Sequence, residues 1–134
     1  MRWLVMLLVM NGLATGTEAK DLVDAIHQVE TSGRLGPIRG DGGKALGPLQ
    51  IHEVCWIDAN MPDGTYADCA DLSYAKRVFA RYMARYATER RLGRPVTDED
   101  RARIWNGGPN GYKKKATLKY WDKVRKELND EQVD

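Results

Sequence analysis

Residues 33–48 constrain the fold more than any other segment, because they hold six glycines and two prolines. Glycine destabilises a helix interior and proline lacks the amide hydrogen that a helix needs, so a helix through this segment is excluded. The same residues are typical of turns. The stretch from Ile38 to Leu46 therefore predicts a short β-hairpin that turns near Asp41.

The segment before the glycine-rich stretch predicts a short helix. Leu22, Ile26 and Val29 recur at helical spacing, Asp21 is available as the N-cap, and Gly33 is available to end the helix.

Further helices are predicted after the hairpin. Pro48 suits the first turn of a second helix that runs through Cys55. The longest amphipathic pattern starts at Asp71 and ends near Gly93, and the intervening "NMPDGTYAD" is predicted as a loop.

The C-terminal third predicts two more helices. Thr97 and Asp100 are close to a capping box and open a helix that "NGGPNG" must end. A last helix with Tyr120 and Val124 on one side runs into the polar tail "NDEQVD", which we expect to fray. The predicted fold class is therefore mainly α (α+β), with helices and one small β-hairpin between the first two of them.

Length and charge limit the functions that need to be considered. A chain of 134 residues with 43% hydrophobic and 30% charged residues is expected to form one globular domain. The formal net charge of +2 gives no reason to expect a nucleic-acid partner. Only two histidines occur, without a Cys-Xaa-Xaa-Cys or His-Glu-Xaa-Xaa-His spacing, so we expect no metal and no cofactor.

The first 19 residues are typical of a secretory signal peptide. Arg2 precedes an apolar run from Trp3 to Met10, and small residues follow from Ala14 to Ala19. The run falls short of the ~20 apolar residues that span a bilayer, so no stable membrane anchor is expected. We predict a signal at 1–19, a domain at 20–134, and a secreted or periplasmic protein.

The two cysteines, Cys55 and Cys69, lie on either side of the predicted loop. In an oxidising compartment they are predicted to form a disulfide, which would contribute ~3 kcal/mol on the chain-entropy model. The alternative is a pair of buried thiols.

Glu30 conflicts with its surroundings. It continues the row of Leu22 and Ile26 in steps of four, so its carboxylate lies on the face that must be buried. Such conflicts are expected at functional sites, although an ion pair with Arg34 or Arg39 would give the same pattern.

Glu30 and Asp41 together fit the needs of glycosidic bond cleavage. That reaction uses one carboxyl group that stays protonated and one that stays ionised. Burial favours the protonated form of Glu30, whereas Asp41 on a wet loop is expected to keep its charge. The environment of each acid therefore predicts its role. A separation of ~5 Å would favour retention of configuration, and a wider one inversion.

The chain resembles the invertebrate-type lysozymes of the destabilase group. The resemblance runs from about Val23 to about Arg125 and rests on ordered motifs: "ETSG", "GD", "GPLQIHEVCWIDA", "YMARYA", "ARIWNGGPNG", and "YW" in a basic helix. It implies a lysozyme-like fold with a cleft beside the hairpin. It also implies cleavage of the β-1,4 bond between N-acetylmuramic acid and N-acetylglucosamine in peptidoglycan.

By position, the resemblance implies that Glu30 is the proton donor and Asp41 the second catalytic carboxylate, with Asp58 and Glu53 as alternatives for the latter. Aromatic faces and amide groups suit peptidoglycan or chitin-like oligosaccharides. The sugar-binding residues that follow from the resemblance and this chemistry are Gln50, His52, Tyr82, Tyr86, Trp105, Asn106 and Gly107. The tyrosines also fit a buried helix face.

The sequence departs from the family in two places. Many members are rich in cysteine, and Ala59 falls where a partner of Cys69 is expected, about one helical turn from Cys55. Trp105 replaces a histidine that commonly precedes "NGGP". Two other functions stay open: a lytic transglycosylase, which needs no second acid, and a non-catalytic module that binds peptidoglycan or chitin.

Overall fold

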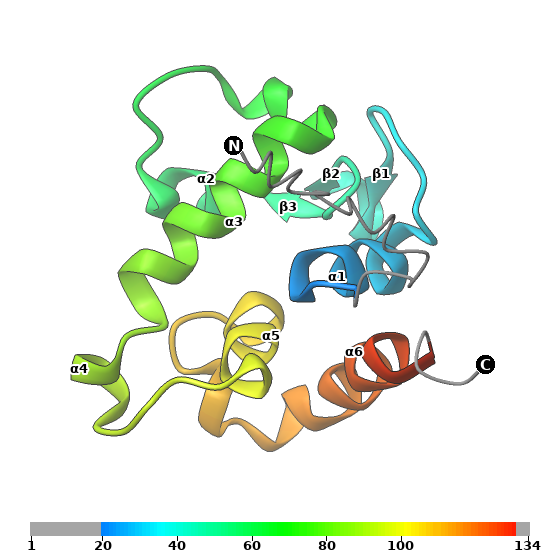
Figure 1. Cartoon of the computed structure of the whole chain (residues 1–134). Helices are drawn as coiled ribbons and strands as arrows, with labels where there is room; N and C mark the ends of the chain where they lie inside the picture. The colour runs from blue at the N-terminus through cyan, green and yellow to red at the C-terminus, as the bar shows by residue number, and fades with distance from the viewer. Residues whose placement is uncertain (1–19, 131–134) are drawn as a thin grey trace, which may run out of the picture.

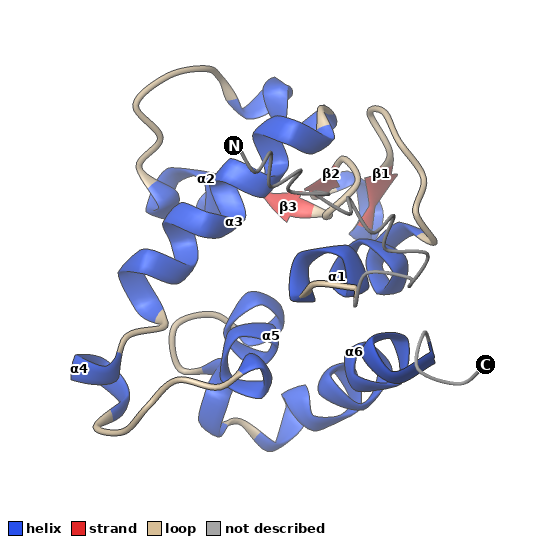
Figure 2. Ribbon diagram, in the orientation of Figure 1, coloured by secondary structure: helices blue, strands red, loops and turns tan. Residues whose placement is uncertain are grey.

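The structure, a computed structural model, describes residues 20–130, so the predicted signal segment lies outside it. Helices dominate, and a small sheet lies at one edge of the molecule (Figure 2). The main elements are α1 Leu22–Thr31, β1 Arg39–Gly40, β2 Ala45–Leu46, β3 Ile51–His52, α2 Glu53–Ala59, α3 Leu72–Tyr86, α4 Glu89–Leu92, α5 Asp98–Gly107 and α6 Leu118–Asp130. This architecture confirms the predicted mainly helical fold with a hairpin between the first two helices.

Helix α1 forms as predicted. The Asp21 side chain accepts a hydrogen bond from the Asp24 amide at 2.9 Å, and the helix ends where Ser32 adopts a left-handed conformation. In Figure 1, α1 lies between the sheet and α6, and its contacts with α6 are extensive. One face of α1 is therefore available to the hairpin while another packs on a helix.

The sheet has one strand more than the sequence predicted. β1 and β2 form the expected antiparallel hairpin, and β3 pairs with β2 so that Ala45 lies opposite His52. The predicted helix start at Pro48 is wrong. The Gln50 amide closes a turn onto the Gly47 carbonyl at 3.0 Å, and Gln50 has a positive φ of 53°, which breaks any helix before Glu53.

The longest predicted helix is divided in two. α3 ends at Tyr86, and Thr88 caps a separate short helix, α4, by accepting a hydrogen bond from the Arg91 amide at 3.2 Å. The predicted continuous helix to Gly93 is wrong because this second cap restarts the backbone. The capping box of Thr97 and Asp100 is confirmed at the start of α5.

The tail and the loop also differ in part from expectation. α6 continues through Asp130, so the first two residues of the tail predicted to fray are helical, and residues 131–134 lie outside the described chain. The loop before α3 includes a turn of 3-10 helix at Tyr66–Ala70. None of the helices in the described part of the chain is long and apolar enough to cross a bilayer.

The core lies where α1, α3, α5 and α6 meet. Ile26, Val78, Ile104 and Val124 each contribute a side chain with 0% exposure, one from each of these helices. Burial of such side chains is the main stabilising contribution to a domain of this size. It fixes α1, and therefore Glu30, relative to the rest of the molecule.

The structure corrects the predicted disulfide. Cys55 and Cys69 are both free thiols, with Cys69 fully buried in the core and Cys55 packed against it. Burial raises the pKa of each thiol to about 12, so both are uncharged and contribute as small apolar groups. The alternative of two buried thiols is the one that the structure supports.

Candidate active site

Glu30 lies near the C-terminal end of α1 and is half-buried. Burial raises the pKa of its carboxyl group to about 7, because removal from water disfavours the charged form. The positive charge of Lys123 on α6 acts in the opposite direction and lowers this pKa. A carboxylic acid with this pKa is mostly protonated below pH 7 and about half protonated at pH 7.

A structural ion pair does not explain Glu30. Arg34 donates through Nε to the Thr31 carbonyl at 3.0 Å, and Arg39 donates to the Gly43 carbonyl at 3.4 Å. No ion pair within residues 20–130 includes Glu30. The two arginines that the sequence offered as partners are thus occupied with backbone carbonyls.

Asp41 occupies a very different setting at the turn between β1 and β2. Its side chain is 67% exposed, and its backbone has a positive φ of 50° between Gly40 and Gly42. The His52 imidazole lies beside it, with 3.2 Å between His52 Nε2 and Asp41 Oδ2. The Asp41 carboxylate is therefore in contact with water and with one imidazole.

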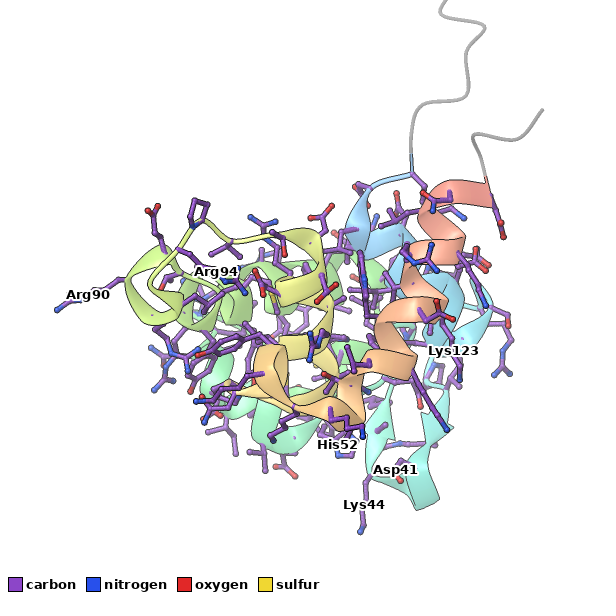
Figure 3. The ribbon with its side chains drawn as sticks, turned by 90° about the horizontal axis from the view of Figure 1, so that it is seen from below. Asp41, Lys44, His52, Arg90, Arg94 and Lys123 are labelled. Atoms are coloured by element: carbon purple, nitrogen blue, oxygen red, sulfur yellow. The ribbon has the colours of Figure 1, made fainter. Side chains whose placement is uncertain are left out.

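A cavity of about 300 Å³ brings the two acids together. The sequence-predicted residues on its wall come from α1, the hairpin, β3 and α5, and Figure 3 shows Asp41 and His52 side by side at one edge of the molecule. The wall consists of Glu30, Asp41, Ala45, Gln50, His52, Trp105 and Asn106. A larger cavity of about 750 Å³ lies elsewhere, and the acid that lines it in the described part of the chain, Asp71, caps α3.

Gln50 on this wall has a structural task. Its Nε2 donates to the Ile38 carbonyl at 3.2 Å and to the Gly47 carbonyl at 2.9 Å. These bonds tie the two ends of the hairpin together. A β-carbon on Gly40 would lie 1.9 Å from the Gln50 Oε1, so a larger residue at this position would displace the amide from its hydrogen bonds. The amide therefore holds the loop from which Asp41 projects.

Trp105 links the cavity to the core. Its ring packs edge-on against Phe79 at 5.1 Å and against Tyr82 at 5.8 Å between ring centroids. Tyr82 is only 4% exposed and Tyr86 packs against it, and neither lines the cavity. The structure therefore places these two tyrosines behind the cavity wall, where Tyr82 supports Trp105.

The remaining candidates lie outside the cavity. Gly107 follows Asn106, and its carbonyl accepts a hydrogen bond from Lys114 Nζ at 2.7 Å. Asp58 is half-buried on α2 and Glu53 lines a neighbouring cavity, so neither alternative shares the cavity with Glu30. Of the acids considered, Asp41 is the one that does.

Two features of the site could not be predicted from the sequence. Lys123 acts on Glu30 from a helix distant in the chain, and His52 pairs with Asp41 across the sheet. The contact between α1 and α6 has no local signature. The second feature depends on β3, which the sequence did not predict. Within the described residues, no group of three histidine, cysteine or acidic side chains is placed to hold a metal ion.

Comparisons with known proteins identify the family of this chain. Residues 20–127 match the family model Destabilase. The lysozyme of Meretrix lusoria is 41% identical over 86 residues, which are 63% of this chain and 69% of that protein. The invertebrate-type lysozyme of Ruditapes philippinarum is 38% identical over 63% of this chain and 62% of its own length. The aligned region thus spans about two thirds of these relatives.

Solved structures show the same fold. A chain in the crystal structure of Meretrix lusoria lysozyme in complex with Aeromonas hydrophila PliI aligns with a TM-score of 0.70 and 35% identity, over 83% of this chain and 91% of that one. Tapes japonica lysozyme aligns with a TM-score of 0.65 and 34% identity, over 76% and 84%. The predicted lysozyme-like fold is therefore confirmed, and the chain belongs to the destabilase family of invertebrate-type lysozymes.

Proposed function

We propose that this chain is a lysozyme that hydrolyses the β-1,4 bond between N-acetylmuramic acid and N-acetylglucosamine in peptidoglycan. The observation that carries the proposal is a pair of carboxyl groups in unlike settings on one cavity. Burial raises the pKa of Glu30 to about 7, whereas Asp41 is exposed beside an imidazole. This asymmetry is what glycoside hydrolysis requires.

Glu30 is the general acid. Its proton passes to the glycosidic oxygen as the bond to the anomeric carbon breaks, so the leaving sugar departs as a neutral alcohol. Asp41 is the nucleophile or the stabiliser of the oxocarbenium-like sugar cation. Water then completes the hydrolysis by adding its oxygen to the anomeric carbon, and Glu30 regains a proton.

The remaining cavity residues bind sugar in this proposal. Trp105 offers an aromatic ring braced by Phe79, and Asn106 offers an exposed amide for acetamido groups. Gln50 acts mainly through the loop that it holds. The lysozyme names of the relatives favour hydrolysis over lytic transglycosylation.

Export is part of the proposal. The basic, apolar and small-residue layout of residues 1–19 supports a secretory signal and delivery to the outside of the cytoplasm, where peptidoglycan lies. Expression of the full chain, followed by N-terminal sequencing of the released protein, tests this. A released chain that still begins at residue 1 would contradict a cleaved signal.

Turbidity of a bacterial wall suspension tests the activity. We expect clearing by the wild type and a loss of at least about a hundredfold in rate for Glu30→Gln and for Asp41→Asn, since each removes a group that the reaction needs. Mass spectrometry of the products separates the classes: reducing ends indicate hydrolysis and anhydro sugars a transglycosylase. Binding without new ends would indicate a non-catalytic module.

A further inference from the structure

A second cavity of about 310 Å³ lies directly beside the catalytic one. The two cavities share the side chain of His52, which forms part of both walls. The second wall consists of Arg39, Gly43, Lys44, His52, Glu53, Val54 and Tyr66. A chain of sugars that places its scissile bond between Glu30 and Asp41 would therefore pass close to this second cavity.

Unpaired positive charge distinguishes the second cavity. Arg39 and Lys44 are exposed, and within residues 20–130 neither takes part in an ion pair. Arg39 makes one long hydrogen bond, to the Gly43 carbonyl. Among the described residues on this wall, Glu53 is the only acid, and Figure 3 shows Lys44 extending from the edge that carries Asp41 and His52. Two cations thus face one acid.

The frame that holds these charges is ordered. The Tyr66 hydroxyl donates a hydrogen bond to the Ile51 carbonyl at 2.6 Å and also lies 3.3 Å from the Lys44 carbonyl. It therefore links β3 to the hairpin. Arg39 pairs with Leu46 in the sheet, and His52 lies opposite Ala45. Backbone pairing and the Tyr66 hydroxyl therefore hold the strand and turn that carry the two cations beside β3.

Peptidoglycan and chitin differ in the chemistry that such a cavity can recognise. Both carry acetamido groups, but the muramic acid of peptidoglycan also carries a lactyl group that ends in a carboxylate or in a peptide with its own carboxylates. Arginine and lysine are the usual partners of carboxylates.

We infer that the cavity of Arg39 and Lys44 binds a carboxylate of the muramyl substituent, and that it makes the enzyme prefer peptidoglycan strands to uncharged chitin oligomers. The inference rests on the proposed function, because it assumes that the glycan occupies the neighbouring catalytic cavity. It assigns to these two cations a recognition task that the catalytic acids do not perform.

Calorimetric binding tests the inference without turnover. Glu30→Gln serves as the background, and its dissociation constants are measured for repeats of N-acetylglucosamine and N-acetylmuramic acid without peptide, for the same repeats with peptide, and for chitotetraose. Arg39→Gln and Lys44→Gln are added singly and together. Arg90→Gln on α4 is the matched control, because Arg90 is an exposed arginine at the opposite end of the molecule (Figure 3).

We expect the background protein to bind the muramyl ligands more tightly than chitotetraose. This preference should fall about threefold for each single change and about tenfold for the double change, the range of exposed ion pairs. Added salt should weaken it as well, and Arg39→Lys should retain it. The control should leave the preference unchanged. A larger preference for the peptide-bearing ligand assigns the carboxylate to the peptide. A larger preference for the peptide-free ligand assigns it to the lactyl group, whose carboxylate the peptide bond removes, and equal preference shows that the cavity accepts either carboxylate.

Equal binding of all three ligands, or a preference that survives the double change, would overturn the inference alone. If none of the three ligands binds, both the proposed function and the inference are overturned. Circular dichroism and melting curves of each variant establish that a change in affinity does not come from loss of the fold.

Discussion

His52 Nε2 lies 3.2 Å from Asp41 Oδ2, and the pair joins the end of β3 to the turn of the hairpin. Asp41 projects from a left-handed position between glycines, so local backbone geometry does little to hold its carboxylate. The imidazole is the side chain that fixes it. This contact links the carboxylate at the hairpin turn to the neighbouring strand β3.

His52→Gln is therefore expected to lower kcat about three- to tenfold, because the carboxylate loses its fixed orientation. The same change made in Asp41→Asn should have little further effect, because the two residues act as one unit. Steady-state kinetics of the two single variants and the double variant measure this coupling. Independent effects that simply multiply would contradict a positioning task and assign His52 to sugar binding alone.

Activity should fall as the pH rises through about 7, because Glu30 must hold its proton and its pKa is raised to that value by burial. Lys123 lowers this pKa, so Lys123→Gln should move the alkaline limb of the rate profile to higher pH and raise activity at pH 8 about twofold. Lys119→Gln, one turn earlier on the same exposed helix side, is the control. An alkaline limb that does not move would show that the charge of Lys123 does not affect the pKa of Glu30.

Glu30 should also make folding stability depend on pH. Its pKa is 4.5 in the unfolded chain and about 7 in the folded protein. Below pH 4.5 Glu30 is therefore protonated in both states and does not change the free energy of unfolding. Between these values the unfolded chain loses its proton first, and stability declines as the pH rises, by up to about 3 kcal/mol. Glu30→Gln should remove this loss. Urea unfolding of both proteins at pH 4 and pH 8 measures it, and equal stability differences at the two pH values would refute it.

The two cysteines give a prediction of their own. Burial raises the pKa of Cys55 and Cys69 to about 12, so both thiols should react slowly with a disulfide reagent in the native protein and fully in denaturant. A thiol count of two after denaturation is expected. A count of zero without reductant would show a bridge that the structure lacks.

The sequence carried the parts of the fold that depend on local chemistry. Asp21 and the pair Thr97 and Asp100 predicted helix starts correctly, since a cap is recognised by residue type and spacing. The third strand escaped because Gln50, a non-glycine residue, takes a left-handed conformation that only the surrounding turn explains. Local patterns cannot report such a tertiary constraint.

In the candidate site, too, the sequence predicts local features but not tertiary contacts. The burial of Glu30 followed from its row on α1, and the exposure of Asp41 from its glycine neighbours. The neighbours of the two acids could not be predicted, because Lys123 and His52 lie on α6 and β3, which approach the acids only in the folded protein. The packing of Tyr82 against Trp105 could not be predicted from the sequence either, since a helical row predicts burial but not what is buried against it.

Each strand of the sheet is two residues long, whereas α1 packs into the core. Fluctuations that separate β1 from β2 cost less free energy than those that open a packed helix. Asp41 is therefore expected to move with the sheet, whereas the packing of α1 holds Glu30 in place. Gentle warming should displace Asp41 while Glu30 stays in place. The enzyme should therefore lose activity at a lower temperature than the one at which it unfolds.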